Sequence, residues 1–162
     1  MLQVACTYAL KIFCLGTTFI AAVIGTNAHV NCAQHKLWEN CKDIDPSLCL
    51  KPQFWMEIVF IAFSWLVIVG SILNILWACL CTPDGKQDSG CQSLAGILTL
   101  ISGALIIAAA VQIDNAHHTD KLPEAFKTEV RKADLYIDKI AAGALSLLAS
   151  VLYFSSAGTL CM

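Results

Sequence analysis

Four long apolar runs alternate with polar segments along the chain. They cover residues of about 4–25, 54–81, 93–113 and 140–161. A helix needs roughly 20 mostly apolar residues to cross the hydrocarbon of a bilayer, and each run reaches that length. Because hydrocarbon leaves an unpaired backbone group without a partner, helices are the form expected for such runs. The pattern therefore predicts an all-α membrane protein, a left-handed bundle of four transmembrane helices that forms one domain over residues 1–162.

The polar segments between the runs differ in length, and this difference determines the predicted topology. Residues 82–92 form a short connection, whereas residues 26–53 and 114–139 form longer ones. Short connections join antiparallel neighbours. With four spans, both termini then lie on the same side of the membrane as residues 82–92. The two longer segments lie on the other side.

Composition narrows the class of protein. Hydrophobic residues make up 57% of the chain and charged residues 14%, whereas soluble domains have about 45–50% and about 25%. The net charge of −2 provides no basic surface for nucleic acid. These values argue against a soluble enzyme and against a nucleic-acid-binding protein. The first apolar run is expected to be retained, because it lacks the basic start and the cleavage site of a signal peptide.

Small and ionisable residues within the runs indicate structural roles. Ala142, Ser146 and Ser150 recur every four residues, and such a stripe lets membrane helices approach closely. We interpret it as a packing face within the bundle, with a dimerisation face as the alternative. Lys11 is expected to snorkel to the nearer membrane surface, and Glu57 is expected to reach the interface at its own end.

The histidines do not form a convincing catalytic or metal site. His117 and His118 are adjacent and lie near Asp114 and Asp120, but solvated loop histidines are far commoner than metal ligands of this kind. We therefore expect no metal, no cofactor and no enzyme activity. All four histidines fall in the predicted loops, and they are His29, His35, His117 and His118.

Three cysteines outside the apolar cores of the runs admit more than one interpretation. Cys79 and Cys81 lie at a membrane boundary, where they are acylation candidates or simply small buried apolar residues. Cys32 has no obvious partner, so it is either free or linked to another chain.

Two general rules disagree on which side of the membrane is cytoplasmic. Most basic residues lie in the two longer segments, and the positive-inside rule would place those segments in the cytoplasm. Cys41 and Cys49, however, bracket a short polar loop that contains Pro46, which suits a disulfide hairpin. Stable disulfides form outside the cell. The residues alone leave the orientation open.

The first longer segment carries the sequence Leu37-Trp38-Glu39-Asn40-Cys41, followed by Cys49. This pattern resembles the first extracellular loop of the superfamily that comprises claudins, peripheral myelin protein and stargazin. Three more segments are similar to claudins and occur in the expected order. They are the start Met-Leu-Gln-Val at residues 1–4, the glycine-containing run at residues 95–105, and residues 123–130 with the later pair 135–136. Together the matches cover most of the chain.

This resemblance to claudins implies an orientation, a location and an extracellular fold. It places the termini in the cytoplasm, residues 26–53 and 114–139 outside the cell, and the protein in the plasma membrane at cell–cell junctions. Cys41 and Cys49 would form a disulfide that pins a small extracellular β-sheet. Trp38 would pack onto the extracellular end of the bundle, with Leu37 and Asn40 as further members of the signature.

The chain also departs from the claudin pattern. The first extracellular segment has no second tryptophan ahead of Trp38, and only residues 50–53 separate Cys49 from the next span. We therefore expect a compact member with a reduced sheet. Because the sequence stops at Met162, directly after the fourth span, a cytoplasmic tail and a motif for a PDZ scaffold are not expected.

Apolar residues of the second longer segment follow a helical period. They recur at spacings of four and three, which is one face of a helix, and Pro123 suits its first turn. The fourth helix is thus expected to begin several turns before its apolar span. The residues of this face are Phe126, Val130, Ala133, Ile137 and Ile140.

The resemblance to claudins implies two alternative functions. The first is a junction protein that mediates adhesion and controls paracellular permeability, through contacts with itself or with claudin-like proteins in cis and trans. The second is an auxiliary subunit that modulates a membrane channel or receptor. Membrane lipid is the partner common to both. The candidate trans contacts are Lys121, Leu122, Pro123, Glu124 and Phe126. The loop charges that would tune a pore nearly cancel and predict no strong ion selectivity; they are Lys36, Glu39, Lys42, Asp43 and Asp45.

Overall fold

Four long helices make up nearly all of the described chain. The computed structural model describes residues 2–32, 55–80, 85–117, 128, 132–133 and 135–160. The helices are α1 (Leu2–Asn31), α3 (Trp55–Leu80), α4 (Gly85–His117) and α6 (Tyr136–Leu160). Each contains a segment long and apolar enough to cross a membrane. The prediction of an all-α chain with four helices long and apolar enough to cross a membrane is thus confirmed, and no strand occurs within these residues.

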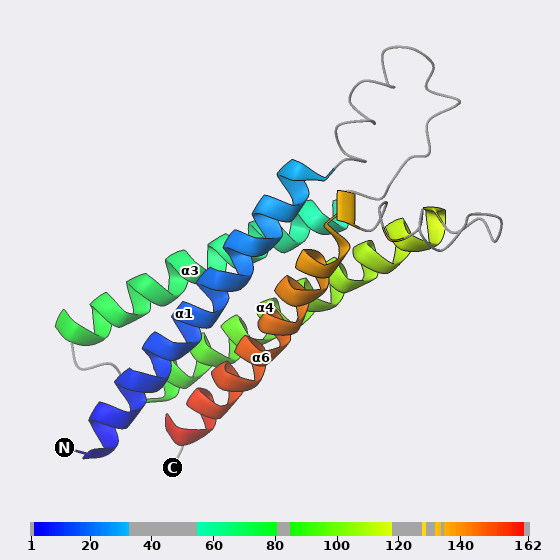
Figure 1. The fold of residues 1–162 in the computed structure, drawn as a ribbon. Coiled ribbons are helices and arrows are strands. Elements are labelled where there is room, and N and C mark those ends of the chain that lie inside the picture. Colours follow the sequence, from blue (N-terminus) through cyan, green and yellow to red (C-terminus); the bar gives the residue numbers. More distant parts are fainter. Residues whose placement is uncertain are drawn as a thin grey trace.

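The helices alternate in direction. Figure 1 shows both chain termini at the same end of the bundle, which is also the end where α3 finishes and α4 begins. α1 finishes, α3 begins, α4 finishes and α6 begins at the opposite end. We call the first the terminal end and the second the loop end. α4 and α6 share the largest interface, and α3 packs mainly against α1 and α4.

The large interface between α4 and α6 depends on small residues. Ala142, Ser146 and Ser150 are all buried, which confirms the predicted role of this stripe in packing within the bundle. The Ser150 hydroxyl donates a hydrogen bond of 2.9 Å to the Gly96 carbonyl of α4. A Cβ atom on Gly103 would lie 3.0 Å from the Gly143 carbonyl oxygen, so the two backbones meet without side chains between them.

Two apolar clusters fill the middle of the bundle. Cys14, Val67, Ala149 and Tyr153 form the one nearer the terminal end, with residues of α4 packed against it. The second joins α3, α4 and α6 nearer the loop end and consists of Phe60, Ile106 and Ala142. The apolar core therefore stops short of both ends of the bundle.

The helices extend beyond the predicted spans. α1 continues to Asn31, beyond the predicted end of the first span at residue 25. α4 begins at Gly85, so most of the predicted loop 82–92 is helical, and it continues to His117. His29 and His117 consequently belong to helices, not loops. Hydropathy finds the apolar centre of a helix, whereas backbone hydrogen bonding continues into the polar turns at each end.

The fourth helix begins later than its periodicity predicts. Leu135 adopts a left-handed backbone conformation with φ of 52°, and α6 starts at the next residue. This residue interrupts the helical phase, because L-residues in left-handed conformation cannot continue a right-handed helix. The predicted apolar face is therefore wrong at this point: Ala133 is exposed and Ile137 is 74% exposed.

Candidate functional site: two buried ionic clusters

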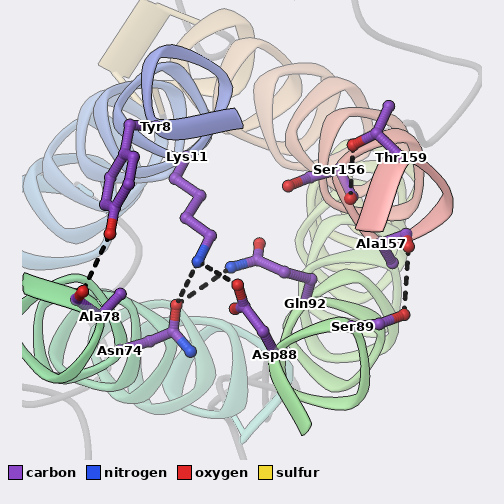
Figure 2. Close-up of polar contacts among 10 residues, drawn as sticks. All are labelled: Tyr8, Lys11, Asn74, Ala78, Asp88, Ser89, Gln92, Ser156, Ala157 and Thr159. Carbon is purple, nitrogen blue, oxygen red and sulfur yellow. Dashed lines mark hydrogen bonds and ion pairs between the residues drawn. The ribbon is translucent and has the colours of Figure 1, made fainter. Parts of the chain in front are cut away.

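A buried ion pair joins α1 to α4 near the terminal end. Lys11 and Asp88 are 4% and 5% exposed, and Lys11 Nζ lies 2.5 Å from Asp88 Oδ2. The same ammonium group donates to Asn74 Oδ1 of α3 at 3.1 Å. Gln92, one turn after Asp88, donates through Nε2 to that Asn74 oxygen at 3.4 Å. We call these four residues the terminal cluster, and Figure 2 shows Lys11 reaching from α1 to its partners on α3 and α4.

Further hydrogen bonds hold the helices around the terminal cluster. The Tyr8 hydroxyl donates to the Ala78 carbonyl at 3.0 Å, which ties α1 to the last turns of α3. On the other side, the Ser89 hydroxyl donates to the Ala157 carbonyl of α6 at 3.1 Å (Figure 2). The terminal cluster is therefore fixed by bonds from every helix of the bundle.

A second buried ionic cluster lies near the loop end and is centred on Glu57. Glu57 and Lys139 are each 1% exposed, and Lys139 Nζ lies 2.8 Å from Glu57 Oε1. His29 Nδ1 lies 2.6 Å from the other carboxylate oxygen, Oε2. Lys139 Nζ also donates to Cys32 Sγ at 3.4 Å. We call His29, Cys32, Glu57 and Lys139 the loop-end cluster.

The geometry of the loop-end cluster assigns its protons. An ionised carboxylate accepts hydrogen bonds and cannot donate them, so we assign a hydrogen to His29 Nδ1. Glu57 then has an ammonium on one oxygen and an imidazole N–H on the other. Cys32, the residue directly after α1, is completely buried and accepts from the same ammonium. A link from Cys32 to another chain would require its thiol to leave this buried position.

Each ionic cluster joins helices that lie diagonally across the bundle and that share few of its contacts. Lys11 and Asp88 join α1 to α4, and Glu57 and Lys139 join α3 to α6. The bond of 2.8 Å between the hydroxyls of Ser71 and Tyr153 joins α3 to α6 a second time. A charged side chain in a membrane span costs several kcal/mol unless it is paired, so these pairs favour one specific arrangement of the helices.

The predicted environments of Lys11 and Glu57 are wrong. Lys11 does not snorkel to the surface, because Asp88 and Asn74 hold its ammonium inside the bundle. Glu57 is not exposed at its end of the bundle, because Lys139 and His29 face it from α6 and α1. Their partners Asp88 and Lys139 fall in segments that hydropathy predicts to be loops.

A helical signal could have located both partners. Lys139 lies three residues before Ala142 and seven before Ser146, on the same face as the small-residue stripe of α6. Asp88 and Gln92 are one turn apart and precede Thr99, which is also buried on α4. Extending the packing faces beyond the apolar runs would have included these charges.

Most of the other predicted site residues lie outside the described part of the chain. They are the signature residues Leu37, Trp38 and Asn40, the cysteines Cys41, Cys49 and Cys81, the charges Lys36, Glu39, Lys42, Asp43 and Asp45, and the trans-contact candidates Lys121, Leu122, Pro123, Glu124 and Phe126. Cys79 is described; it is exposed near the end of α3 and its thiol is free.

The described residues contain no cluster of three or more side chains suited to hold a metal ion. Each of the two clusters holds positive and negative side chains in contact with one another, buried near one end of the bundle.

Comparison of the chain with protein-family profiles, with characterised proteins and with solved structures finds no match.

Proposed function

We propose that this chain is a claudin-like junction protein of the plasma membrane that mediates cell–cell adhesion and paracellular barrier or permeability control. In this role it acts through contacts of its extracellular segments, without catalysis or a cofactor. Its termini are cytoplasmic, and its partners are membrane lipid and claudin-like chains in the same and the apposed membrane. The sequence resemblance at residues 37–49 and 123–130 supports the assignment to this superfamily.

The loop-end cluster is the structural observation that carries the proposal. Its residues tie together the end of α1, the start of α3 and the start of α6. These are the helix ends next to residues 33–54 and 118–134. A protein that transmits adhesion through such segments needs their attachment points held rigidly, and buried ion pairs within a bundle provide this. A small disulfide-pinned sheet formed by residues 33–54 would complete the adhesive surface.

Expression in cells that lack junction strands tests the proposal. We expect the chain to concentrate in strands at cell contacts and to change the transepithelial resistance. Trp38→Ala, in the proposed extracellular fold, should abolish strand formation. Trp77→Ala is the matched control, because Trp77 is exposed on α3 at the opposite end of the bundle. A diffuse membrane pool with unchanged resistance would contradict the proposed function.

A second function, that of an auxiliary subunit of a channel or receptor, is favoured by the exposure of α3. This helix packs mainly on α1 and α4, and one side of it exposes Leu66, Leu73 and Leu76. A lateral partner in the membrane could contact this side. Co-purification with a channel that is lost in the variant Leu73→Ser, with no strands at cell contacts, would support this alternative over the first.

A further inference from the structure

Three tryptophans of α3 lie on the outer surface of the bundle. Trp55, Trp65 and Trp77 are 53%, 39% and 57% exposed. With a rise of about 1.5 Å per residue, Trp55 at the loop end and Trp77 toward the terminal end lie about 33 Å apart along the helix axis. This separation is close to a whole number of turns, about six, so both lie on nearly the same face of α3. Trp65 lies near the midpoint between them.

The indole N–H groups of these tryptophans differ in their partners. Trp65 Nε1 donates to Thr26 Oγ1 of α1 at 3.4 Å, and its ring meets the Phe19 ring edge-on with 6.1 Å between the centroids. Trp55 and Trp77 make no hydrogen bond and no ring contact with any residue that the structure describes. Hydrocarbon offers an N–H group no acceptor, whereas water and headgroups at a membrane surface do. Trp65 is therefore suited to the membrane interior, and Trp55 and Trp77 are suited to its two surfaces.

The outer face of α3 between Trp55 and Trp77 is apolar. All exposed residues of this stretch are apolar, Trp65 included, and the most exposed are Ile58, Leu66, Val69 and Leu73. Glu57 is the single charged residue of α3, and it is 1% exposed. α3 is also the helix least covered by the others: 22% of its most apolar segment is buried, against at least 39% in each other helix.

The length of this apolar face matches the thickness of a bilayer. The hydrocarbon of a typical bilayer is about 30 Å thick, and a tilt of about 20°, the average for membrane helices, would reduce the distance of about 33 Å between the tryptophans to about 31 Å across the membrane. A plasma membrane rich in sterols, with about 32–33 Å of hydrocarbon, fits this distance better than the endoplasmic reticulum, with about 27 Å.

We propose that the outer face of α3 contacts lipid acyl chains directly, with Trp55 and Trp77 at the two headgroup surfaces and Trp65 near the bilayer centre. The surface fits a bilayer with about 30–33 Å of hydrocarbon. A covering protein would require neither a tryptophan at each membrane surface nor a spacing equal to the bilayer thickness, so these features favour lipid. The inference is independent of the junction function and of orientation, because exchanging the two sides leaves each depth unchanged.

Three variants of the full chain test the depths of the tryptophans. Each keeps one of Trp55, Trp65 and Trp77 and carries Trp→Phe substitutions at the other tryptophans. The purified variants are placed in phosphatidylcholine vesicles whose acyl chains carry bromine, a contact quencher of indole fluorescence, either near the glycerol or near the methyl end. We expect the deep bromine to quench Trp65 about twofold more than the shallow bromine does, and Trp55 and Trp77 to show the reverse order.

The three tryptophans serve as controls for one another because they lie on the same helix. Circular dichroism and gel filtration verify that each variant keeps the fold and show its oligomeric state. A Trp65 that neither bromine quenches would mean that a second copy of the chain covers this face, and it would overturn the proposal. Equal depths for all three tryptophans would overturn it as well.

The wild-type chain tests the preferred thickness without any substitution. Brominated phosphatidylcholines with short, medium and long acyl chains, which give about 23, 30 and 36 Å of hydrocarbon, compete with unbrominated lipid for the surface of the protein. We expect the strongest association at about 30 Å and a two- to threefold weaker one at about 23 Å, because mismatch has a cost that grows with each ångström. Association that is independent of thickness, or strongest in the thinnest bilayer, would contradict the proposed fit. Strand formation in cells is measured separately, so failure of this inference leaves the proposed junction function untouched.

Discussion

Lys11, Asp88, Glu57 and Lys139 are the residues whose surroundings depart most from those of an ordinary membrane helix. All four are at least nine-tenths buried, and each ammonium lies within hydrogen-bonding distance of a carboxylate. Removing one partner leaves a buried charge without compensation, whereas removing both can be nearly neutral. The two clusters therefore predict large effects for single substitutions and small effects for matched double substitutions.

Lys11→Met should lower the free energy of unfolding by about 3–5 kcal/mol, because the Asp88 carboxylate stays buried without its ammonium. The double variant Lys11→Met with Asp88→Leu should regain most of this loss. The free energy of unfolding of the single and the double variant is measured by unfolding in mixed micelles with sodium dodecyl sulfate, with circular dichroism as the signal. Lys86→Met, at an exposed position in the first turn of α4, should change stability by less than about 0.5 kcal/mol. Equal losses at Lys86 and Lys11 would contradict a specific role for the pair.

Glu57→Gln and Lys139→Met should be strongly non-additive. Each alone leaves a buried charge, so the double-mutant cycle is expected to give a coupling energy of about 0.5–3 kcal/mol. Tyr153→Phe is the comparison, because it removes a neutral hydroxyl that bonds to Ser71, and such a bond costs about 0.6 kcal/mol on average in membranes. The same micelle assay measures all variants. Additive losses at Glu57 and Lys139 would show that the ion pair contributes nothing to the fold.

At the scale of helices, some glycines allow neighbouring helices to approach closely. Gly25 of α1 lies against the Phe60 ring of α3 and Ile106 of α4, and Gly103 and Gly143 meet between α4 and α6. Other glycines have no such neighbour: a Cβ on Gly16 or Gly70 meets nothing within 4 Å. Some glycines of this bundle are therefore needed for close helix contacts, whereas others are not, and substitution by alanine should distinguish the two kinds.

Gly25→Ala should destabilise the bundle by about 1–3 kcal/mol, because its Cβ would clash with the Phe60 ring and force α1 and α3 apart. Gly16→Ala in the same helix should be neutral or stabilising by up to about 1 kcal/mol, since alanine is the better helix former. Thermal unfolding in detergent compares the two. A larger loss at Gly16 than at Gly25 would contradict the observed contact between α1 and α3.

At the scale of the whole molecule, the four antiparallel helices place both termini at one end and the two longer segments at the other. The bundle is thus divided into a short terminal side and a loop side, each with its own ionic cluster just inside the membrane-spanning region. Which side faces the cytoplasm determines whether residues 33–54 can carry a disulfide and an adhesive surface. Orientation is accordingly the property on which the proposed function depends most.

Epitope tags at the N-terminus, at the C-terminus and within residues 33–54 determine this orientation. In intact cells we expect antibodies to reach only the tag within residues 33–54, and in permeabilised cells all three. The two terminal tags should always behave alike, because four spans return the chain to its starting side. Terminal tags that are accessible in intact cells would overturn the extracellular assignment while leaving the bundle as described.

The amino-acid sequence by itself determined how many long apolar helices the described part of the chain contains, their approximate positions and the packing face of α6. These follow from local properties: a run of apolar residues must form a helix in hydrocarbon, and Ala142, Ser146 and Ser150 share one face of any helix. It also located Lys11 and Glu57 as unusual charges, without finding their partners. The resemblance to claudins at residues 37–49 also comes from the sequence alone, because these residues lie outside the part of the chain that the structure describes.

Only the tertiary structure decided which charges are paired. Lys11 and Asp88 are 77 residues apart, and Cys32 and Lys139 are 107 apart. Their contacts depend on how far each helix is rotated and shifted along its neighbours, which hydropathy does not encode because lipid accepts any apolar face equally well. α6 starts directly after the left-handed residue Leu135, and in its first turns Lys139 is buried whereas Ile137 is 74% exposed. The physical reason is that local apolarity specifies insertion into the membrane, whereas the pairing of buried charges specifies one arrangement of the inserted helices.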